Sequence, residues 1–130
     1  MTTTHTTPPG DRSADEAAII QVVDAYFESW FMGVPERMKA ALHPQLAKRG
    51  VHPDGPDGID ADTAASMVGD TEQGYGTKYS PEQRSVAIRI DDIYGSIATV
   101  TVSSPIYHEY IHLVRDEAGW RILNTLWQPT

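Results

Sequence analysis

The stretch YHEYIHLVRDEAGWRILNTLWQP, residues 107–129, decides the fold. It is rich in aromatic and β-branched residues on both sides of residues 116–119 (DEAG), which predicts two strands joined by a tight turn. Pairing Arg115 with Trp120 across this turn sets the register, because a slip by one residue would move Leu113 to the opposite face of the sheet. Continued along the hairpin, this register predicts three further pairs: Leu113–Ile122, Ile111–Asn124 and Glu109–Leu126.

The same register divides the hairpin into two faces. One is mostly apolar but includes a carboxylate and an amide: Tyr107, Glu109, Ile111, Leu113, Trp120, Ile122, Asn124 and Leu126. The other is polar and aromatic: His108, Tyr110, His112, Arg121, Leu123, Thr125 and Trp127. Polar groups in an apolar wall are typical of a ligand pocket, so we expect the first face to line one. The second face would expose an apolar patch in a monomer. We therefore expect it to form a homodimer interface, with coverage by the N-terminal tail as the alternative.

Composition and charge limit the class of protein. The chain has 130 residues, which suits one domain with one core, and it has no cysteine for a disulfide, a thiolate nucleophile or a cysteine metal cluster. A net charge of −8 argues against nucleic acid or an anionic membrane as a partner, since both attract clustered Lys and Arg. No apolar run has the length of a membrane span, and the N-terminus lacks a signal-peptide pattern, so we expect a cytoplasmic protein.

The order of elements predicts the fold class. We expect a disordered tail over residues 1–12, which are rich in Thr, Pro and Gly, and a single domain over residues 13–130. Within that domain the patterns predict helices from Ser13 to Gly33, from Pro35 to Leu42 and over 63–69, a short strand over 46–51, a loop over 52–61, and four strands from Arg84 onward. Helices that come first and strands that come last are typical of an α+β domain, with the helices on one face of an antiparallel sheet.

The N-terminal helix with Tyr26 and Trp30, the segment MGVPERMKAALHP and the closing hairpin together resemble the nuclear transport factor 2-like superfamily, abbreviated NTF2-like. The resemblance covers residues 14–129 and is strongest to the lumazine-binding-like group, with polyketide-cyclase-like proteins and ketosteroid isomerases as more distant relatives. It implies a cone in which a strongly curved antiparallel sheet wraps the first helix. The open end of such a cone is commonly a ligand pocket, and its outer sheet face often forms a dimer. The chain has no match for the aspartate base of the isomerases, so their activity is not implied.

Three residues are candidates for proton chemistry. Glu109 faces the expected pocket, and burial of a carboxylate in an apolar wall favours its protonated form, which suits proton transfer near neutral pH. The alternative for Glu109 is a structural ion pair with Arg49 or Lys48 on the short strand. His52 is the candidate acid or base at the pocket mouth. Tyr26 is the third candidate; its alternative is a core position in which the hydroxyl finds a polar partner.

We expect five further residues to contact a ligand: Trp30, Arg49, Met67, Tyr107 and Asn124. Trp30 lies one helical turn from Tyr26 and has the same alternative, a place in the core. Asn124 could instead satisfy a backbone group at a bend in the sheet. No histidine spacing matches a metal-ligand motif, and His108 and His112 are about 13 Å apart at ordinary strand rise, so we expect no metal and no cofactor.

These features support two functions. The first is a small-molecule-binding protein that takes a flat, largely apolar or heterocyclic ligand and could act as a cofactor-free isomerase, dehydratase or cyclase. Such reactions need only a placed base and a placed hydrogen-bond donor in a dry cavity. The alternative is a non-catalytic, dimeric ligand carrier or accessory module, which the absence of a complete catalytic constellation favours. The fold hosts both kinds of protein, so fold alone does not choose between them.

Overall fold

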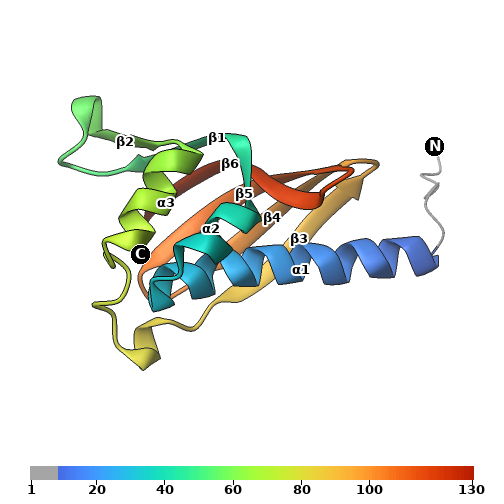
Figure 1. Ribbon diagram of the computed structural model, residues 1–130, viewed down its shortest axis with the longest axis horizontal. Coiled ribbons are helices and arrows are strands. Elements are labelled where there is room, and N and C mark those ends of the chain that lie inside the picture. Colours follow the sequence, from blue (N-terminus) through green and yellow to red (C-terminus); the bar gives the residue numbers. More distant parts are fainter. Residues whose placement is uncertain (1–8) are drawn as a thin grey trace.

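The computed structural model describes residues 9–130 (Figure 1). The elements are, in chain order, α1 (Pro9–Met32), α2 (Pro35–Ala41), β1 (Leu42–Val51), η1 (Pro56–Gly58), β2 (Ile59–Asp62), α3 (Ala64–Glu72), η2 (Pro81–Gln83), β3 (Ala87–Tyr94), β4 (Ile97–Ser103), β5 (Tyr107–Asp116) and β6 (Gly119–Pro129). The long α1 lies across one face of the sheet, and α2 and α3 stand near its C-terminal end (Figure 1). The predicted α+β cone is confirmed.

The helix α1 begins earlier than the sequence predicted. Residues 1–8 of the expected tail lie outside the described residues, whereas residues 9–12 are helical, so the predicted start at Ser13 is wrong by four residues. Proline is favoured at the first helical position, where its missing N–H has no partner to lose. The helix ends at Gly33, whose φ of 69° is the left-handed conformation that closes many helices. The chain then re-enters a helix at Pro35.

The sheet is six-stranded and mixed, in the order β2-β1-β6-β5-β4-β3. Its pairings are antiparallel except for β1 and β6, which run parallel, so the expectation of a purely antiparallel sheet is wrong at this one junction. β1 spans ten residues rather than the six predicted, and its register with β6 shifts between Leu42 and Ala47. The short β2 occupies part of the stretch predicted as a loop. These two strands form one wall of the site described below.

The core fills the space between α1 and the inner face of the sheet. Its fully buried members come from the helices and the central strands: Ile19, Val23, Met38, Val100, Val102, Ile111, Leu113 and Ile122. At the far end of the sheet, Asp15 of α1 accepts hydrogen bonds from Trp120 Nε1 at 3.0 Å and from Arg115 at 3.1 Å. This carboxylate is buried and ties α1 to the β5–β6 turn, so the helix has a fixed direction across the sheet.

A β-bulge in β6 changes the hairpin register. Near the turn the prediction is correct, with Leu113 opposite Ile122. One extra residue, Leu123, then separates that pair from the next, in which His112 lies opposite Asn124. A bulge of this kind exchanges the two faces of the strand beyond it. Ile111 therefore pairs with Thr125, Glu109 pairs with Trp127, and the predicted partners Asn124 and Leu126 are wrong.

Candidate functional site

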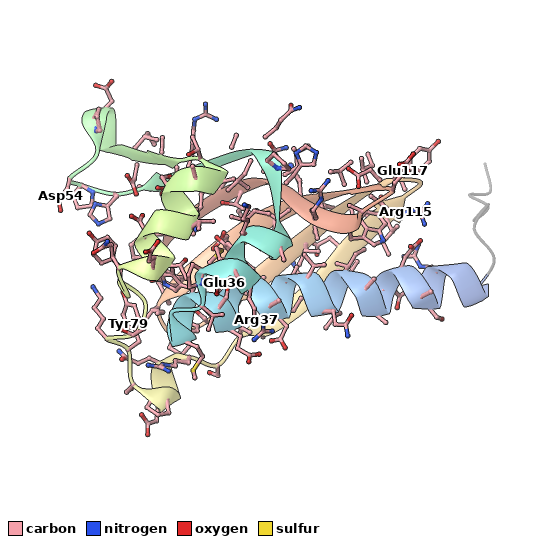
Figure 2. All side chains as sticks on the ribbon, viewed as in Figure 1. Glu36, Arg37, Asp54, Tyr79, Arg115 and Glu117 are labelled. Atoms are coloured by element: carbon pink, nitrogen blue, oxygen red, sulfur yellow. The ribbon has the colours of Figure 1, made fainter. Side chains whose placement is uncertain are left out.

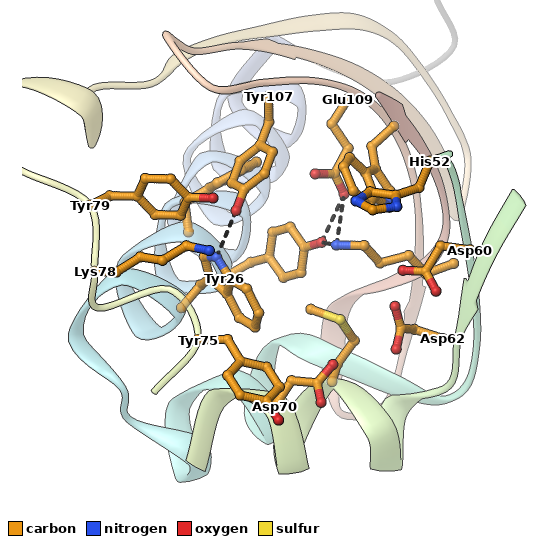
Figure 3. Close-up of a pocket in the computed structure, with 15 residues that line it drawn as sticks. Tyr26, His52, Asp60, Asp62, Asp70, Tyr75, Lys78, Tyr79, Tyr107 and Glu109 are labelled. Carbon is orange, nitrogen blue, oxygen red and sulfur yellow. Dashed lines mark hydrogen bonds and ion pairs between the residues drawn. The ribbon is translucent and has the colours of Figure 1, made fainter. Parts of the chain in front are cut away.

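A cavity of about 260 Å³ opens between the C-terminal half of α1, the strands β1, β2, β5 and β6, and α3 with the segment that follows it (Figure 3). Its walls combine aromatic rings, a methionine and charged side chains: Tyr26, Phe27, Trp30, Lys48, His52, Asp60, Asp62, Met67, Asp70, Tyr75, Lys78, Tyr79, Tyr107, Glu109 and Trp127. Figure 2 places Asp54 and Tyr79 at this end of the molecule, and Arg115 and Glu117 at the opposite end.

Glu109 is the most deeply buried charge in the cavity wall, with 2% of its surface exposed. Its Oε2 accepts a hydrogen bond of 2.8 Å from the Tyr26 hydroxyl and lies 3.7 Å from the Lys48 ammonium. Lys48 in turn donates a hydrogen bond to the Tyr26 oxygen. Three residues from α1, β1 and β5 thus form a closed cluster in which one acid has one cation and one hydroxyl as partners.

The other oxygen of Glu109, Oε1, accepts no hydrogen bond from any residue in the described range 9–130. The contacts with Tyr26 and Lys48 both go to Oε2, and Figure 3 shows the second oxygen on the side of the carboxylate that faces Tyr107. A carboxylate oxygen that is partly withdrawn from water gains free energy when it receives a hydrogen bond. A donor that enters the cavity would therefore find a prepared acceptor.

The strand patterns explain why Lys48 and Glu109 meet. Glu109 lies on β5 at the same inward phase as the buried Ile111. Lys48 pairs with the inward-facing Thr125 across the parallel β1–β6 junction. Lys48 also lies over two rings, with its ammonium 5.1 Å from the centre of Tyr26 and 5.6 Å from that of Trp127. Both rings present a face that attracts a cation, so they help to hold the ammonium in place.

Tyr26 remains a neutral hydroxyl in this cluster. Burial raises the pKa of Tyr26 well above its ordinary value of 10, and the adjacent Glu109 raises it further, since an ionised phenol would face a second negative charge. Its proton is directed at Glu109, so Tyr26 fixes the carboxylate rather than offering a proton to the cavity.

Aromatic rings form the opposite wall. Trp30 Nε1 donates a hydrogen bond of 3.2 Å to the Tyr107 hydroxyl oxygen. The Tyr107 ring meets Tyr79 edge-on at 6.0 Å and Trp127 edge-on at 5.7 Å, measured between ring centres. Burial raises the pKa of Tyr107, and the neighbouring Tyr79 hydroxyl adds to the shift. Tyr107 is therefore also a neutral hydroxyl, and the wall suits a flat, unsaturated ligand.

Glycines give the two tryptophans of the wall their positions. A Cβ on Gly50 would lie 2.2 Å from Trp127 Cε2, so the indole rests directly on the backbone of β1. A Cβ on Gly76 would lie 2.4 Å from the Trp30 carbonyl oxygen and 2.6 Å from its indole ring. Only glycine permits such close approach of a ring to the chain.

Three aspartates border the cavity on its β2–α3 side. Asp60 and Asp62 are inward residues of β2, and Asp70 lies in α3 (Figure 3). Asp62 accepts a hydrogen bond of 2.8 Å from Ser66, whereas Asp60 and Asp70 have no hydrogen bond or ion pair with any described residue. Burial raises the pKa of Asp70, and the charges of Asp62 and Asp60 raise it further. This side of the cavity therefore has a negative potential.

His52 lies at the cavity mouth, with its ring 6.4 Å from that of Trp127. Its Nδ1 accepts a hydrogen bond of 3.2 Å from the backbone N–H of Asp54. When the ring is neutral, its proton therefore resides on Nε2.

Comparison with known proteins identifies the family. The family model described as "Putative lumazine-binding" matches residues 14–128, which is most of the chain. The chain belongs to this family. A comparison with curated proteins found no match. Because the family lies within the NTF2-like superfamily, the resemblance predicted from the sequence is confirmed.

Solved NTF2-like structures share the fold. An NTF2-like protein of unknown function from Silicibacter pomeroyi superposes with a TM-score of 0.72 at 16% identity, covering 92% of this chain and 98% of that one. One of unknown function from Methylobacillus flagellatus gives 0.66 at 19%, covering 96% of each chain. A ketosteroid isomerase-like protein from Erwinia carotovora gives 0.61 at 14%, covering 87% and 94%. At these identities the likeness shows the fold alone.

In this NTF2-like chain the cavity gathers most of the residues expected at the site. Glu109, Tyr26 and His52 line it, and so do three of the predicted ligand contacts: Trp30, Met67 and Tyr107. Two predicted contacts do not. Arg49 is exposed on the outer face of β1, so the partner of Glu109 is Lys48. Asn124 is turned outward by the bulge at Leu123 and lies 3.5 Å from His112.

Sequence reasoning missed several residues of this NTF2-like cavity. The hairpin pattern predicts Trp127 on the outer face, and the composition of residues 52–61 predicts a loop at Asp60, but both residues line the cavity. The signal for Asp60 and Asp62 is their alternation with Ile59 and Ala61. A pattern of only four residues is too short to predict a strand. Within residues 9–130, no three His, Asp or Glu side chains are grouped to hold a metal ion, and no helix is long and apolar enough to cross a membrane.

Proposed function

We propose that the protein binds a flat aromatic or heterocyclic small molecule in the cavity, with Glu109 as its buried hydrogen-bond acceptor. The observation that carries this proposal is Oε1 of Glu109, which lies in an open cavity without a donor from the described residues. Aromatic walls such as Tyr107 and Trp127 would stack on the ring of the ligand. The Lys48 ammonium and the Tyr26 hydroxyl hold the carboxylate in its orientation before the ligand arrives.

A titration monitored by tryptophan fluorescence tests this proposal, because Trp30 and Trp127 line the cavity. The probes are lumazine, 2-naphthamide and 2-naphthol, which are flat, bicyclic and carry N–H or O–H donors. We expect saturable quenching, and a probe at 100 times its Kd should add about 2.7 kcal/mol to stability. Glu109→Gln should weaken binding, whereas Glu117→Gln, which removes an exposed charge at the far end of the same hairpin, should not. Failure of all three probes to saturate in the millimolar range would contradict the proposal.

A second candidate function is proton transfer without a cofactor, which the same free oxygen of Glu109 favours. Its Oε1 would remove a proton from an activated C–H of a bound ligand and return it to another carbon, so that an isomerisation balances. The neutral Tyr107 hydroxyl would donate to the oxyanion that develops, and Tyr26 would position the base. Deuterium exchange into 2-tetralone in D₂O tests this candidate. A rate equal to that of buffer, or equal in wild type and Glu109→Gln, would contradict it.

We also propose that the outer sheet face forms a homodimer. Four of its large apolar side chains are more than half exposed: Tyr94 at 77%, Ile97 at 58%, Tyr110 at 51% and Leu126 at 51%. Patches of this kind on soluble domains commonly mark an interface. Light scattering should give a dimer mass, and Tyr110→Lys should convert it to a monomer. A wild-type mass that stays monomeric at high concentration would contradict the interface.

A further inference from the structure

Negative side chains outnumber positive ones in the cavity wall, and they gather on its β2–α3 side. Four carboxylates line the cavity against two ammonium groups. One of those ammonium groups, on Lys48, is already committed to Glu109 and Tyr26. The other, on Lys78, lies over the Tyr79 ring at 5.3 Å, on the opposite side of the view in Figure 3 from Asp60 and Asp62. The β2–α3 side therefore keeps carboxylates that form no ion pair with a described cation, although the charge of Lys48 also acts on Asp70 and lowers its pKa.

Two independent features of the cavity are acceptor oxygens that would be stabilised by a hydrogen-bond donor on the ligand. One is Oε1 of Glu109, which receives no hydrogen bond from a described residue and can only accept. The other is the pair Asp60 and Asp70, which have no hydrogen bond or ion pair with any described side chain. An anionic ligand would leave all of these oxygens without donors and add a like charge beside them. Like-charge juxtaposition in a partly desolvated site is strongly disfavoured.

We infer that the cavity is specific for a flat aromatic cation whose polar edge carries N–H donors, of the amidinium or protonated amino-heterocycle class. This inference rests on the proposed ligand-binding function and names the chemical class of the ligand. The aromatic ring lies against Tyr107 and Trp127, where ring faces attract a cation as well as a flat surface. One N–H of the polar edge reaches Glu109 Oε1, and the positive charge lies toward Asp60 and Asp70.

Three probes of one shape and three charges test this inference: 2-naphthamidine, which is a cation, 2-naphthamide, which is neutral, and 2-naphthoate, which is an anion. Calorimetric titration of the full-length protein at pH 7 should give the highest affinity for 2-naphthamidine, a lower one for 2-naphthamide and the lowest for 2-naphthoate. We expect at least a tenfold ratio between the first and the last. Raising the salt concentration should reduce that ratio, because screening weakens the partly exposed charges.

Variants identify the carboxylates responsible. Asp70→Asn should lower the affinity for 2-naphthamidine at least threefold and should lower the amidine-to-amide affinity ratio, because the variant removes a charge. Glu117→Gln, an exposed carboxylate far from the cavity, should alter neither affinity. An unchanged amidine-to-amide ratio in Asp70→Asn would overturn the inference.

The outcomes also separate this inference from the proposed function. If 2-naphthoate binds as tightly as 2-naphthamidine, the preference for a cation is wrong, although the cavity still binds flat molecules. If none of the three probes binds, both the preference and the ligand-binding function are contradicted.

Discussion

Removing the ammonium of Lys48 should destabilise the protein strongly, because it leaves Glu109 charged and buried with one neutral partner. In Lys48→Met the aliphatic stem is kept, so the change is mainly electrostatic. The two charges are 3.7 Å apart, and their side chains are only 11% and 3% exposed. At an effective dielectric constant of 20 their attraction is roughly 4.5 kcal/mol.

The net effect of Lys48→Met is smaller than this attraction, because the ammonium no longer has to leave water on folding. Loss of one partner of a buried pair typically costs about 3–5 kcal/mol. We therefore expect about 3 kcal/mol at pH 7, which corresponds to a fall in Tm of roughly 10 °C for a chain of this size. Lys39→Met on the exposed face of α2 is the control and should be within about 0.5 kcal/mol of wild type.

Urea unfolding, monitored by far-UV circular dichroism, measures this cost. The double variant Lys48→Met/Glu109→Gln should recover at least half of the loss, because the orphaned charge is then gone. A cost below about 1 kcal/mol for Lys48→Met would refute the buried ion pair. A double variant no more stable than Lys48→Met would show that the loss arises from packing instead.

Three further predictions concern the cavity wall. Tyr26→Phe removes the hydroxyl that donates to Glu109 at 2.8 Å and should cost about 1.5–3 kcal/mol in urea unfolding, as expected for a hydrogen bond to a charged group; a cost near zero would place the phenol elsewhere. Gly50→Ala should displace the Trp127 indole, cost about 1–3 kcal/mol and shift the tryptophan emission; an unchanged spectrum and stability would contradict the contact. The raised pKa of Asp70 means that its charged form is disfavoured by folding, so its contribution to stability is present below its ordinary pKa of 3.8 and is lost as pH rises through the raised value. Asp70→Asn should therefore raise the free energy of unfolding at pH 7 by about 0.5 kcal/mol, and this gain should shrink as the pH falls toward 4. A gain in stability that does not depend on pH would argue against this account.

The sequence predicted the class of fold and the inward direction of Glu109 for physical reasons. β5 runs without interruption from residue 107 to 116, so the period-two pattern that turns Ile111 and Leu113 inward also turns Glu109 inward. The same holds within one helix: Tyr26 and Trp30 are one turn apart in α1, so they lie on the same face. Local periodicity thus fixed the direction of these side chains.

The bulge at Leu123 marks where that reasoning stops. It inserts one residue into β6, and no local pattern in ILNTLW distinguishes a bulged strand from a regular one. Every residue beyond it changes face, so the predictions that Asn124 lines the pocket and that Trp127 lies on the outer surface are both wrong. The choice is made by burial of Thr125 and Trp127 against other elements, a long-range effect.

The remaining residues of the site depend on strand pairings that are distant in sequence. The sequence offers both Arg49 and Lys48 as partners for Glu109, and only the parallel β1–β6 register places Lys48 inward and Arg49 outward. Asp60 and Asp62 line the cavity because β2 pairs with β1. The four residues of β2 contain no pattern that predicts this pairing. A catalytic or binding role for each of these residues stays a prediction.

A crystal structure of the protein with 2-naphthamidine tests the central claim most directly. We predict the naphthalene ring in the cavity beside Tyr107 and Trp127, with one amidinium nitrogen within about 3.2 Å of Glu109 Oε1. The Tyr26 and Lys48 contacts to Oε2 should be unchanged. A probe bound on the outer sheet face, or one in the cavity whose amidinium points away from Glu109, would contradict the claim that this carboxylate is the prepared acceptor of a ligand site.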